Sequence, residues 1–303
     1  MVMSLRWKAL SASVRGASHE LGGYGNQDAV RLKNPSDSDD VLLLAVADGH
    51  GSARSFRSAR GSAIAVECAL RQLRQFVRRL GPDAPLSRVR NQARSRWPPA
   101  LLAAWKSAVR ADLVASPFSQ LEFAAFPEPP PAVTPGEDLP ISAYLAYGAT
   151  LITVAITRRY ILYSQLGDGD ILAVRADGVV SRPLPRRHEF MANQTVSLCS
   201  YHAPREFQIR VDALRGAAPA LVMLSTDGYA NCFGDDETFF KVGGDFLSYL
   251  RSEGAGFVGE KLEEWLRQSS HDGSGDDITV GLAARASAFP SLARPRAESP
   301  SFP

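Results

Sequence analysis

The sequence predicts an α/β sandwich built on antiparallel sheets, and three observations lead to this fold class. Apolar, β-branched runs are separated by hairpin-length turns, and strands joined in this way pair antiparallel. Two helical stretches follow the first strong strand and two more precede the last one, which is typical of helices that cover sheet faces. With 303 residues, 45% of them hydrophobic and 22% charged, the chain can bury a large core and is not disordered as a whole.

The expected strands are short apolar runs that are bounded by turn residues. Val41–Ala47 is a continuous apolar run typical of a buried strand. Thr150–Ile156 and Tyr160–Leu166 are separated by three residues, which is hairpin spacing. Asp177-Gly178 makes another tight turn. The remaining expected strands are Ala29–Leu32, Ile171–Val174, Val179-Val180, Phe207–Val211, Ala220–Leu224 and Ile278–Ala283.

Helices are expected where apolar residues recur every three or four positions. One such stripe predicts a long helix over roughly Ser52–Leu80, which Gly81-Pro82 ends. A second helical stretch runs over about Leu86–Ala115, with a break expected at Pro98-Pro99 because proline lacks an amide hydrogen. Two later helices are expected around Asp245–Ser252 and Val258–Gln268.

Residues 1–287 are expected to form a single domain. Within it, a proline-rich insertion at about 116–142 is predicted to be an irregular surface segment, because polyproline cannot maintain helix or sheet hydrogen bonds. A docking site for a proline-reading module is the alternative interpretation of this insertion. Residues 288–303 contain four prolines and few large apolar side chains, so they are expected to be a disordered tail.

The overall charge does not indicate a nucleic-acid or membrane partner. Lys and Arg total 34 against 32 acidic residues, a net charge of +2. Eleven arginines nevertheless lie between Arg54 and Arg96, against only Glu67 and Asp83. We interpret them mainly as the solvated side of an amphipathic helix. A phosphate-binding or acidic-partner face, or a nucleic-acid surface, are the alternatives.

Cysteine usage and hydropathy predict a cytoplasmic protein. Three scattered cysteines without a CxxC pair argue against a disulfide scaffold or a zinc site, and they fit a reducing compartment. No apolar run has the length of a membrane span, and the first residues lack the apolar stretch of a signal peptide.

Aspartates beside strand borders carry the clearest chemical signal. Asp48, Asp168 and Asp227 each follow an expected strand and stand next to glycine, whereas Asp28 and Asp276 each precede a strand. One Asp-Gly pair alone would indicate only a turn. Five gathered carboxylates, however, repel one another unless cations offset their charge. Oxygen ligands without a Cys or His cluster favour Mg²⁺ or Mn²⁺ over zinc, so the pattern predicts a divalent-metal site.

Six short motifs follow one another along nearly the whole chain: Asn26-Gln27-Asp28, Asp48-Gly49-His50-Gly51, Gly148-Ala149-Thr150, Gly167-Asp168-Gly169-Asp170, Thr226-Asp227-Gly228 and Asp276-Asp277-Ile278-Thr279. In this order and spacing they resemble the type 2C metal-dependent protein Ser/Thr phosphatases, in particular a bacterial branch. The resemblance covers about residues 10–285. It implies a four-layer α-β-β-α sandwich of two mostly antiparallel sheets flanked by helix pairs. It also implies a flap-like segment at about 183–206 and hydrolysis of phosphoserine or phosphothreonine in proteins.

The resemblance also implies a role for each matching position. Asp48 would bridge two Mn²⁺ or Mg²⁺ ions, and the Gly49 carbonyl would bind one of them. Asp227 and Asp276 would complete the ligands of the other ion, Asp28 would hold metal-bound waters, and Asp168 matches the position of a third, weaker ion. His50 resembles the general acid that protonates the leaving alkoxide; alternatively it only hydrogen-bonds the neighbouring carboxylate. The expected partner is a phosphorylated protein. A Ser/Thr kinase would add the phosphate that this protein would remove.

The chain departs from the family pattern in ways that concern the substrate. The phosphate-holding arginine expected before Asp28 is absent from Leu21–Gly25, so Arg15, Arg54 and His19 are the candidates to replace it. Asp170 is expected to make the surroundings of the third ion more acidic. None of these departures removes a metal ligand, which favours an active enzyme. The alternative is a catalytically weak or inactive phosphatase-like module that binds a phosphoprotein.

Overall fold

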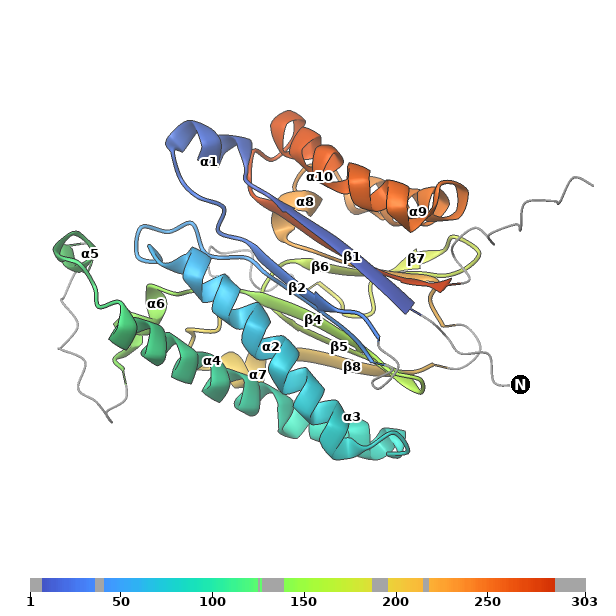
Figure 1. Ribbon diagram of the computed structural model, residues 1–303, viewed down its shortest axis with the longest axis horizontal. Helices are drawn as coiled ribbons and strands as arrows, with labels where there is room; N and C mark the ends of the chain where they lie inside the picture. The colour runs from blue at the N-terminus through green and yellow to red at the C-terminus, as the bar shows by residue number, and fades with distance from the viewer. Residues whose placement is uncertain are drawn as a thin grey trace, which may run out of the picture.

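In the part of the chain that the structure describes, two five-stranded antiparallel sheets lie face to face, and each carries helices on its outer side (Figure 1). The computed structural model describes residues 7–35, 41–124, 126, 139–186, 196–214 and 218–286. The expected tail at 288–303, the centre of the proline-rich insertion and residues 187–195 of the flap-like segment lie outside the described residues. The expected fold class, a four-layer α-β-β-α sandwich, is confirmed.

Both sheets are continuous antiparallel ladders. The first has the order β1-β10-β9-β6-β7 and the second the order β2-β3-β4-β5-β8. The first sheet contains β1 (Trp7–Val14), β10 (Ile278–Arg285), β9 (Leu221–Ser225), β6 (Asp170–Val174) and β7 (Val180–Ser181). The second contains β2 (Ala29–Lys33), β3 (Leu42–Ala47), β4 (Leu151–Ile156), β5 (Tyr160–Leu166) and β8 (Gln208–Ala213).

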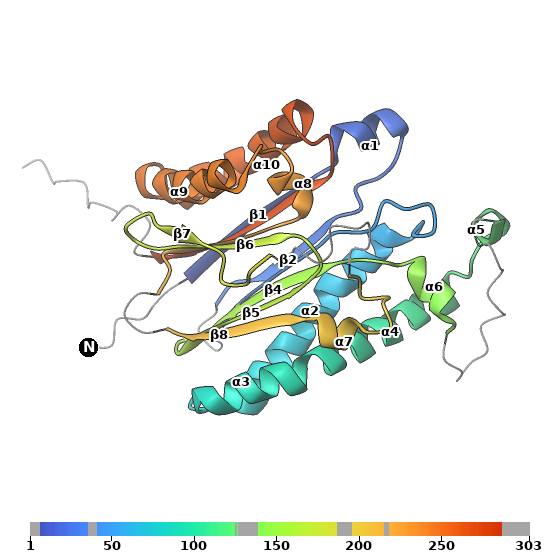
Figure 2. The same cartoon turned by 180° about the vertical axis from the view of Figure 1, so that it is seen from behind.

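Each outer sheet face is covered by its own set of helices (Figures 1 and 2). The β2–β8 sheet is covered by α2 (Ser58–Leu80), α3 (Leu86–Ser95) and α4 (Trp97–Ala115), and the β1–β7 sheet by α9 (Asp236–Ser252) and α10 (Gly254–Asp272). Short helices occupy the connections: α1 (Ala17–Gly22), α5 (Gln120–Ala124), α6 (Ile141–Leu145), α7 (Ala203–Glu206) and α8 (Asp227–Ala230). Among the described residues, no helix combines the length and hydropathy needed to cross a lipid bilayer.

Three layers of buried apolar side chains hold the sandwich together. Between the sheets, Leu44 and Val46 of β3 belong to the same cluster as Val222 and Leu224 of β9. Their complete burial follows from β-strands that are apolar on both faces, because one face meets the other sheet and the other face meets helices. The outer layers lie under α2–α4 and under α9 and α10.

The structure corrects two expected helix boundaries. The first long helix begins at Ser58 rather than Ser52, because residues 52–58 form successive turns in which Ser55 N donates to Ser52 O and Ser58 N donates to Ser55 O, both at 2.8 Å. The second stretch does not break at Pro98-Pro99. It breaks at Arg96, and the two prolines lie in the first turn of α4, where the missing amide hydrogens have no intrahelical partner to lose.

Candidate metal centre

Three carboxylates meet where strands from both sheets end. Asp48 directly follows β3, Asp168 follows β5, and Asp227 opens α8 after β9. One oxygen atom of each lies within 4.8 Å of those of the other two. They border a pocket of about 300 Å³, and among the residues that the structure describes no hydrophobic side chain lines it. Its lining residues are His19, Gln27, Asp48, Gly49, His50, Gly51, Asp168, Asp227, Asp276 and Asp277.

Backbone contacts hold the Asp48 segment in place. Asp48 N donates to Thr150 Oγ1 at 3.1 Å, and Thr150 N donates back to Asp48 O at 2.8 Å. Gly49 forms an isolated antiparallel bridge with Ala149. A Cβ atom on Gly49 would lie 2.6 Å from Gln27 O and 2.8 Å from the Ser58 carbonyl, so only glycine fits at this position.

The charges in this pocket are unfavourable without a cation. Burial raises the pKa of Asp48 well above its usual range, and the nearby Asp28 and Asp227 carboxylates raise it further. Burial, together with repulsion from Asp168, raises the pKa of Asp227 to about 6. A divalent cation would offset this repulsion. Because the three gathered ligand atoms are carboxylate oxygens, the donor set fits a hard ion such as Mg²⁺ or Mn²⁺.

Asp28 and Asp276 lie around the three central carboxylates. Asp28 Oδ2 accepts a hydrogen bond from Thr226 Oγ1 at 2.8 Å, and burial raises the pKa of Asp28 well above its usual range. Asp28 is near enough to repel Asp48 but does not line the pocket. Asp276 lines the pocket but is not one of the three gathered groups. The structure thus brings Asp168 into the central group, although the sequence assigns it only to a third ion.

Asp277 is a buried structural carboxylate whose role the sequence did not reveal. Its Oδ1 accepts from Gly16 N and its Oδ2 from Gln27 N, both at 2.6 Å, so it joins the start of α1 to the segment that precedes β2. His19 Nδ1 lies 3.0 Å from Oδ1. The position of Asp277 directly beside Asp276 was the available signal in the sequence.

Of the residues expected to donate a proton or to bind phosphate, the two histidines line the pocket and the two arginines do not. His50 lines the pocket, its amide donates to Gly148 O at 3.1 Å, and burial lowers the pKa of its imidazole. His19 also lines the pocket. Arg15 and Arg54 are exposed and do not line it, and the Arg15 guanidinium lies 3.6 Å from Glu20.

The expectation that Asp170 adds negative charge near the third-ion position is wrong. Asp170 is 2% exposed, and its two oxygens accept hydrogen bonds from Arg182 and Arg186. Both arginines also pair with Asp236 at the start of α9. The Asp170 charge is therefore compensated inside this network and does not add to that of the pocket.

Comparison with known proteins identifies the family. The family model described as "Protein phosphatase 2C" matches residues 15–267, which is most of the chain. The chain belongs to the protein phosphatase 2C family. No match to the curated proteins was found. The comparison confirms the resemblance that the six motifs carry.

Solved structures of other protein phosphatase 2C-like proteins have the same fold at low identity. The Mycobacterium tuberculosis serine/threonine phosphatase PstP is 15% identical, with a TM-score of 0.54 over 95% of this chain and 100% of that one. A serine/threonine phosphatase from Staphylococcus aureus is 14% identical, with a TM-score of 0.55 over 94% of this chain and 98% of that one. PppA of Pseudomonas aeruginosa is 18% identical, with a TM-score of 0.53 over 92% and 98%. A PstP catalytic domain was solved in complex with two manganese ions.

Proposed function

We propose that this protein phosphatase 2C family member hydrolyses phosphoserine and phosphothreonine in proteins, with two Mn²⁺ or Mg²⁺ ions and a weaker third one. The observation that carries the proposal is the group of Asp48, Asp168 and Asp227, whose oxygens lie within 4.8 Å of one another at a polar pocket. Family membership supports the substrate class. The substrate would be a phosphoprotein in the cytoplasm, and this protein would reverse the reaction of a Ser/Thr kinase.

Each residue in or beside the pocket has a distinct task in this proposal. Asp48 would lie between the two ions, with the Gly49 carbonyl on one of them and Asp227 and Asp276 on the other. Asp28 would orient water, and Asp168 would hold the third ion. When bound, the ions supply positive charge against the phosphoryl oxygens and lower the pKa of the attacking water. Gln27 and Gly51 complete the pocket wall.

The two histidines act on the substrate in this proposal. A serine or threonine alkoxide is a poor leaving group, so His50 in its protonated form would deliver a proton to the leaving oxygen. Because burial lowers the pKa of His50, this form is favoured below neutral pH. His19 is the phosphate-contacting candidate that lines the pocket. Arg15 and Arg54 would contribute only longer-range positive charge, because they lie outside the lining.

The test is phosphate release from a phosphothreonine peptide with Mn²⁺, with Mg²⁺ and with a chelator. We expect metal-dependent phosphate release, and we expect its rate to fall at least about 100-fold in Asp48→Asn. Loss of a residue that binds the metal directly should lower activity more than loss of a residue that only hydrogen-bonds to such a ligand. Asp83→Asn is the matched control, since that side chain is 94% exposed on the far loop between α2 and α3. Unchanged release in Asp48→Asn contradicts the proposal. A folded, metal-binding protein without release favours the non-catalytic phosphoprotein-binding module instead.

A further inference from the structure

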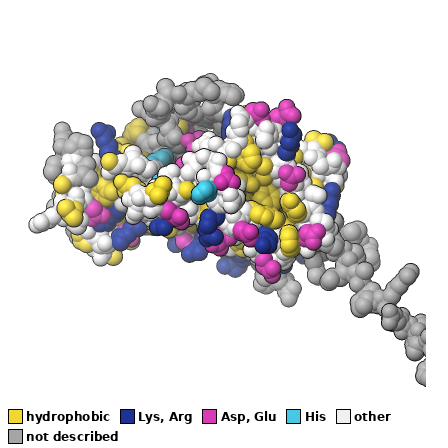
Figure 3. All heavy atoms as spheres, turned by 90° about the horizontal axis from the view of Figure 1, so that it is seen from above, with side chains coloured by type: hydrophobic (Ala, Val, Ile, Leu, Met, Phe, Trp, Pro, Cys, Tyr) yellow, Lys and Arg dark blue, Asp and Glu magenta, His cyan; other side chains and the backbone are white. Residues whose placement is uncertain are grey.

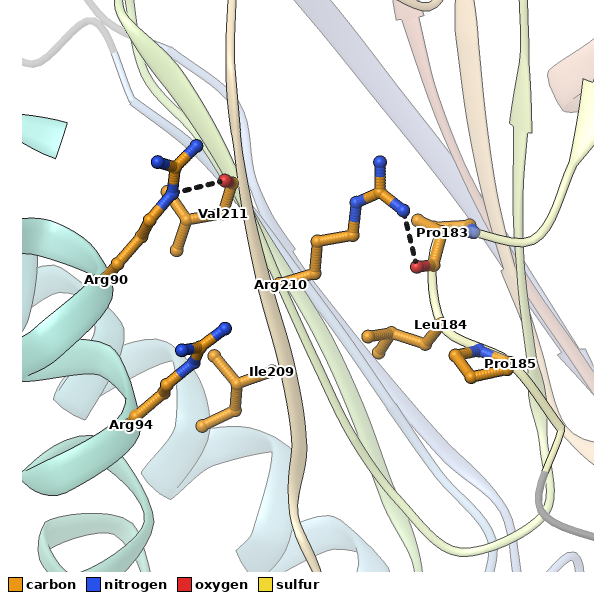
Figure 4. A pocket seen from close by; sticks show the side chains of 8 residues that line it. All are labelled: Arg90, Arg94, Pro183, Leu184, Pro185, Ile209, Arg210 and Val211. Carbon is orange, nitrogen blue, oxygen red and sulfur yellow. Dashed lines mark hydrogen bonds between the residues drawn. The ribbon is translucent and has the colours of Figure 1, made fainter. Parts of the chain in front are cut away.

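A second pocket, of about 280 Å³, lies at the edge of the β2–β8 sheet and has the opposite charge to the metal centre (Figure 4). Its floor is apolar, made by Pro183, Leu184, Ile209 and Val211. Three arginines also line it, Arg90 and Arg94 on one side of β8 and Arg210 on the other, and none of its described lining residues is acidic. An apolar floor within a polar rim is the usual anatomy of a surface that binds another protein.

Two of the three arginines come from one face of α3. Arg90 and Arg94 are one helical turn apart, and Figure 4 shows both side chains directed toward β8. Arg90 Nε donates to Val211 O at 3.2 Å, which fixes the direction of this side chain. Among the described residues, Arg94 has no hydrogen bond or ion pair. Like charges placed this close repel one another, so an anion between them would be stabilised.

The third arginine closes the pocket from the other side of β8. Arg210 Nη1 donates to Pro183 O at 3.2 Å, and Arg210 Nε donates to Asp212 Oδ1 at 2.9 Å and Oδ2 at 2.8 Å. Asp212 thus offsets part of the Arg210 charge. It does not line the pocket and is not paired with Arg90 or Arg94 in any described contact.

The place of the pocket in the fold suits a peptide. β8 is the last strand in its sheet, so half of its backbone groups face away from any strand in the described part of the chain. Leu214 N donates to Arg159 O at 2.7 Å, so in the alternating antiparallel pattern the even-numbered residues of β8 bond toward β5 and the odd-numbered ones, Val211 among them, direct their backbone groups to this edge. An extended segment in the pocket therefore meets backbone groups, apolar side chains and guanidinium groups together.

We propose that this pocket docks an acidic segment of a partner protein, with glutamate or aspartate side chains on Arg90, Arg94 and Arg210 and an apolar side chain on the Leu184 floor. The excess of arginine over acidic residues between Arg54 and Arg96 then has a specific use in α3. The docking surface is separate from the metal centre. This docking proposal does not depend on whether the protein is an active phosphatase.

The experiment measures binding of a fluorescent peptide that has glutamates on both sides of one leucine. The full chain is used with a chelator present, so that acidic peptides cannot bind through a metal ion. We expect Arg94→Glu to weaken binding about tenfold or more, and binding to weaken further as salt is raised. Replacing the peptide's leucine by glycine should also weaken binding, whereas a lysine counterpart should not bind.

Arg88→Glu is the matched control, because Arg88 lies on the same helix, is exposed, and lines a different pocket beside α2 and α4. It should leave peptide affinity within about twofold of the parent protein, since this exposed charge faces another pocket and salt screens its effect on the peptide. Circular dichroism verifies that both variants are folded. Absence of binding, or equal weakening by Arg88→Glu and Arg94→Glu, overturns the proposal. Tighter binding of a single-stranded oligonucleotide through Arg94 also overturns it and assigns the surface to nucleic acid.

Discussion

At the scale of single residues, His50 is the side chain whose task depends most on the substrate. It lines the pocket two residues after Asp48. A proton donor matters when the leaving group is a basic alkoxide, and it matters little when the leaving group is an acidic phenol. We therefore expect His50→Gln to slow release from a phosphothreonine peptide about 100-fold and release from p-nitrophenyl phosphate much less. Steady-state kinetics with the two substrates checks this. Equal losses on both substrates would instead assign His50 a positioning role beside Asp48.

Gly49 tests the geometry of the same loop. A Cβ atom there would lie 2.6–2.8 Å from backbone atoms of Gln27 and Ser58, which cannot move as a side chain can. We expect Gly49→Ala to lower the free energy of unfolding by about 1–3 kcal/mol through overpacking, and to weaken Mn²⁺ binding. Gly51→Ala is the matched control, because its Cβ atom would meet only Gln27 Oε1, at an ordinary 3.7 Å. Urea unfolding of the two variants should separate them, and similar values would show that the loop is not packed as described.

At the scale of elements, local sequence patterns predicted the buried strands better than the first strand and the helix boundaries. The apolar runs of β3, β4 and β5 were identified because strands buried on both faces need continuous hydrophobicity. β1 was missed because its Ser and Ala residues give little strand signal; it is held by pairing with β10 along its whole length. The break at Arg96 was misplaced by two residues, because proline is tolerated in the first turn of a helix.

The short helix α5 is joined to the buried Arg57 by an ion pair. The Arg57 side chain is 5% exposed, and it donates from Nε and Nη2 to Glu122 at 2.6 and 2.8 Å, while Nη1 donates to Ser116 O at 2.6 Å. The Arg57 guanidinium lowers the pKa of Glu122 to about 2. Since the folded-state pKa lies below the unfolded value of about 4.3, the pair stabilises the folded form above that pH, and the contribution is lost as pH falls toward 2.

Glu122→Gln should therefore loosen α5 by about 1 kcal/mol at neutral pH, a value that allows for the partial exposure of the carboxylate. Hydrogen exchange of the α5 amides measures the free energy of opening of this helix. The difference in that free energy between parent and variant should become smaller as pH falls below about 4. Glu264→Gln is the control, because that carboxylate is 67% exposed and pairs only within α10. A difference in opening free energy that stays constant with pH would show that the Glu122 charge does not stabilise α5.

At the scale of the whole molecule, charge is distributed unevenly although its sum is small. The face over α1 and α10 shows acidic and basic side chains interspersed (Figure 3). The candidate metal centre gathers carboxylates, whereas the pocket between α3 and β8 gathers arginines. A balanced net charge of +2 therefore hides two pockets of opposite sign.

The sequence predicted the members of the carboxylate group better than their arrangement. Aspartates that border strands were expected to meet, and Asp48, Asp168 and Asp227 do meet. The separation of Asp276 from that group could not be foreseen, because it depends on how two sheets align. Asp170 was misjudged because its partners, Arg182 and Arg186, lie 12 and 16 residues further along the chain, where no local pattern marks them.

Titration calorimetry with Mn²⁺ measures whether the pocket around Asp48 binds divalent cations. We expect two tightly bound ions and a weaker third one for each chain of the parent protein and of Asp83→Asn. We expect loss of at least one of them in Asp227→Asn, because that residue supplies one of the three gathered carboxylates. No heat of binding in the folded parent protein, or the same stoichiometry and affinity in Asp227→Asn, would contradict binding of divalent cations in this pocket.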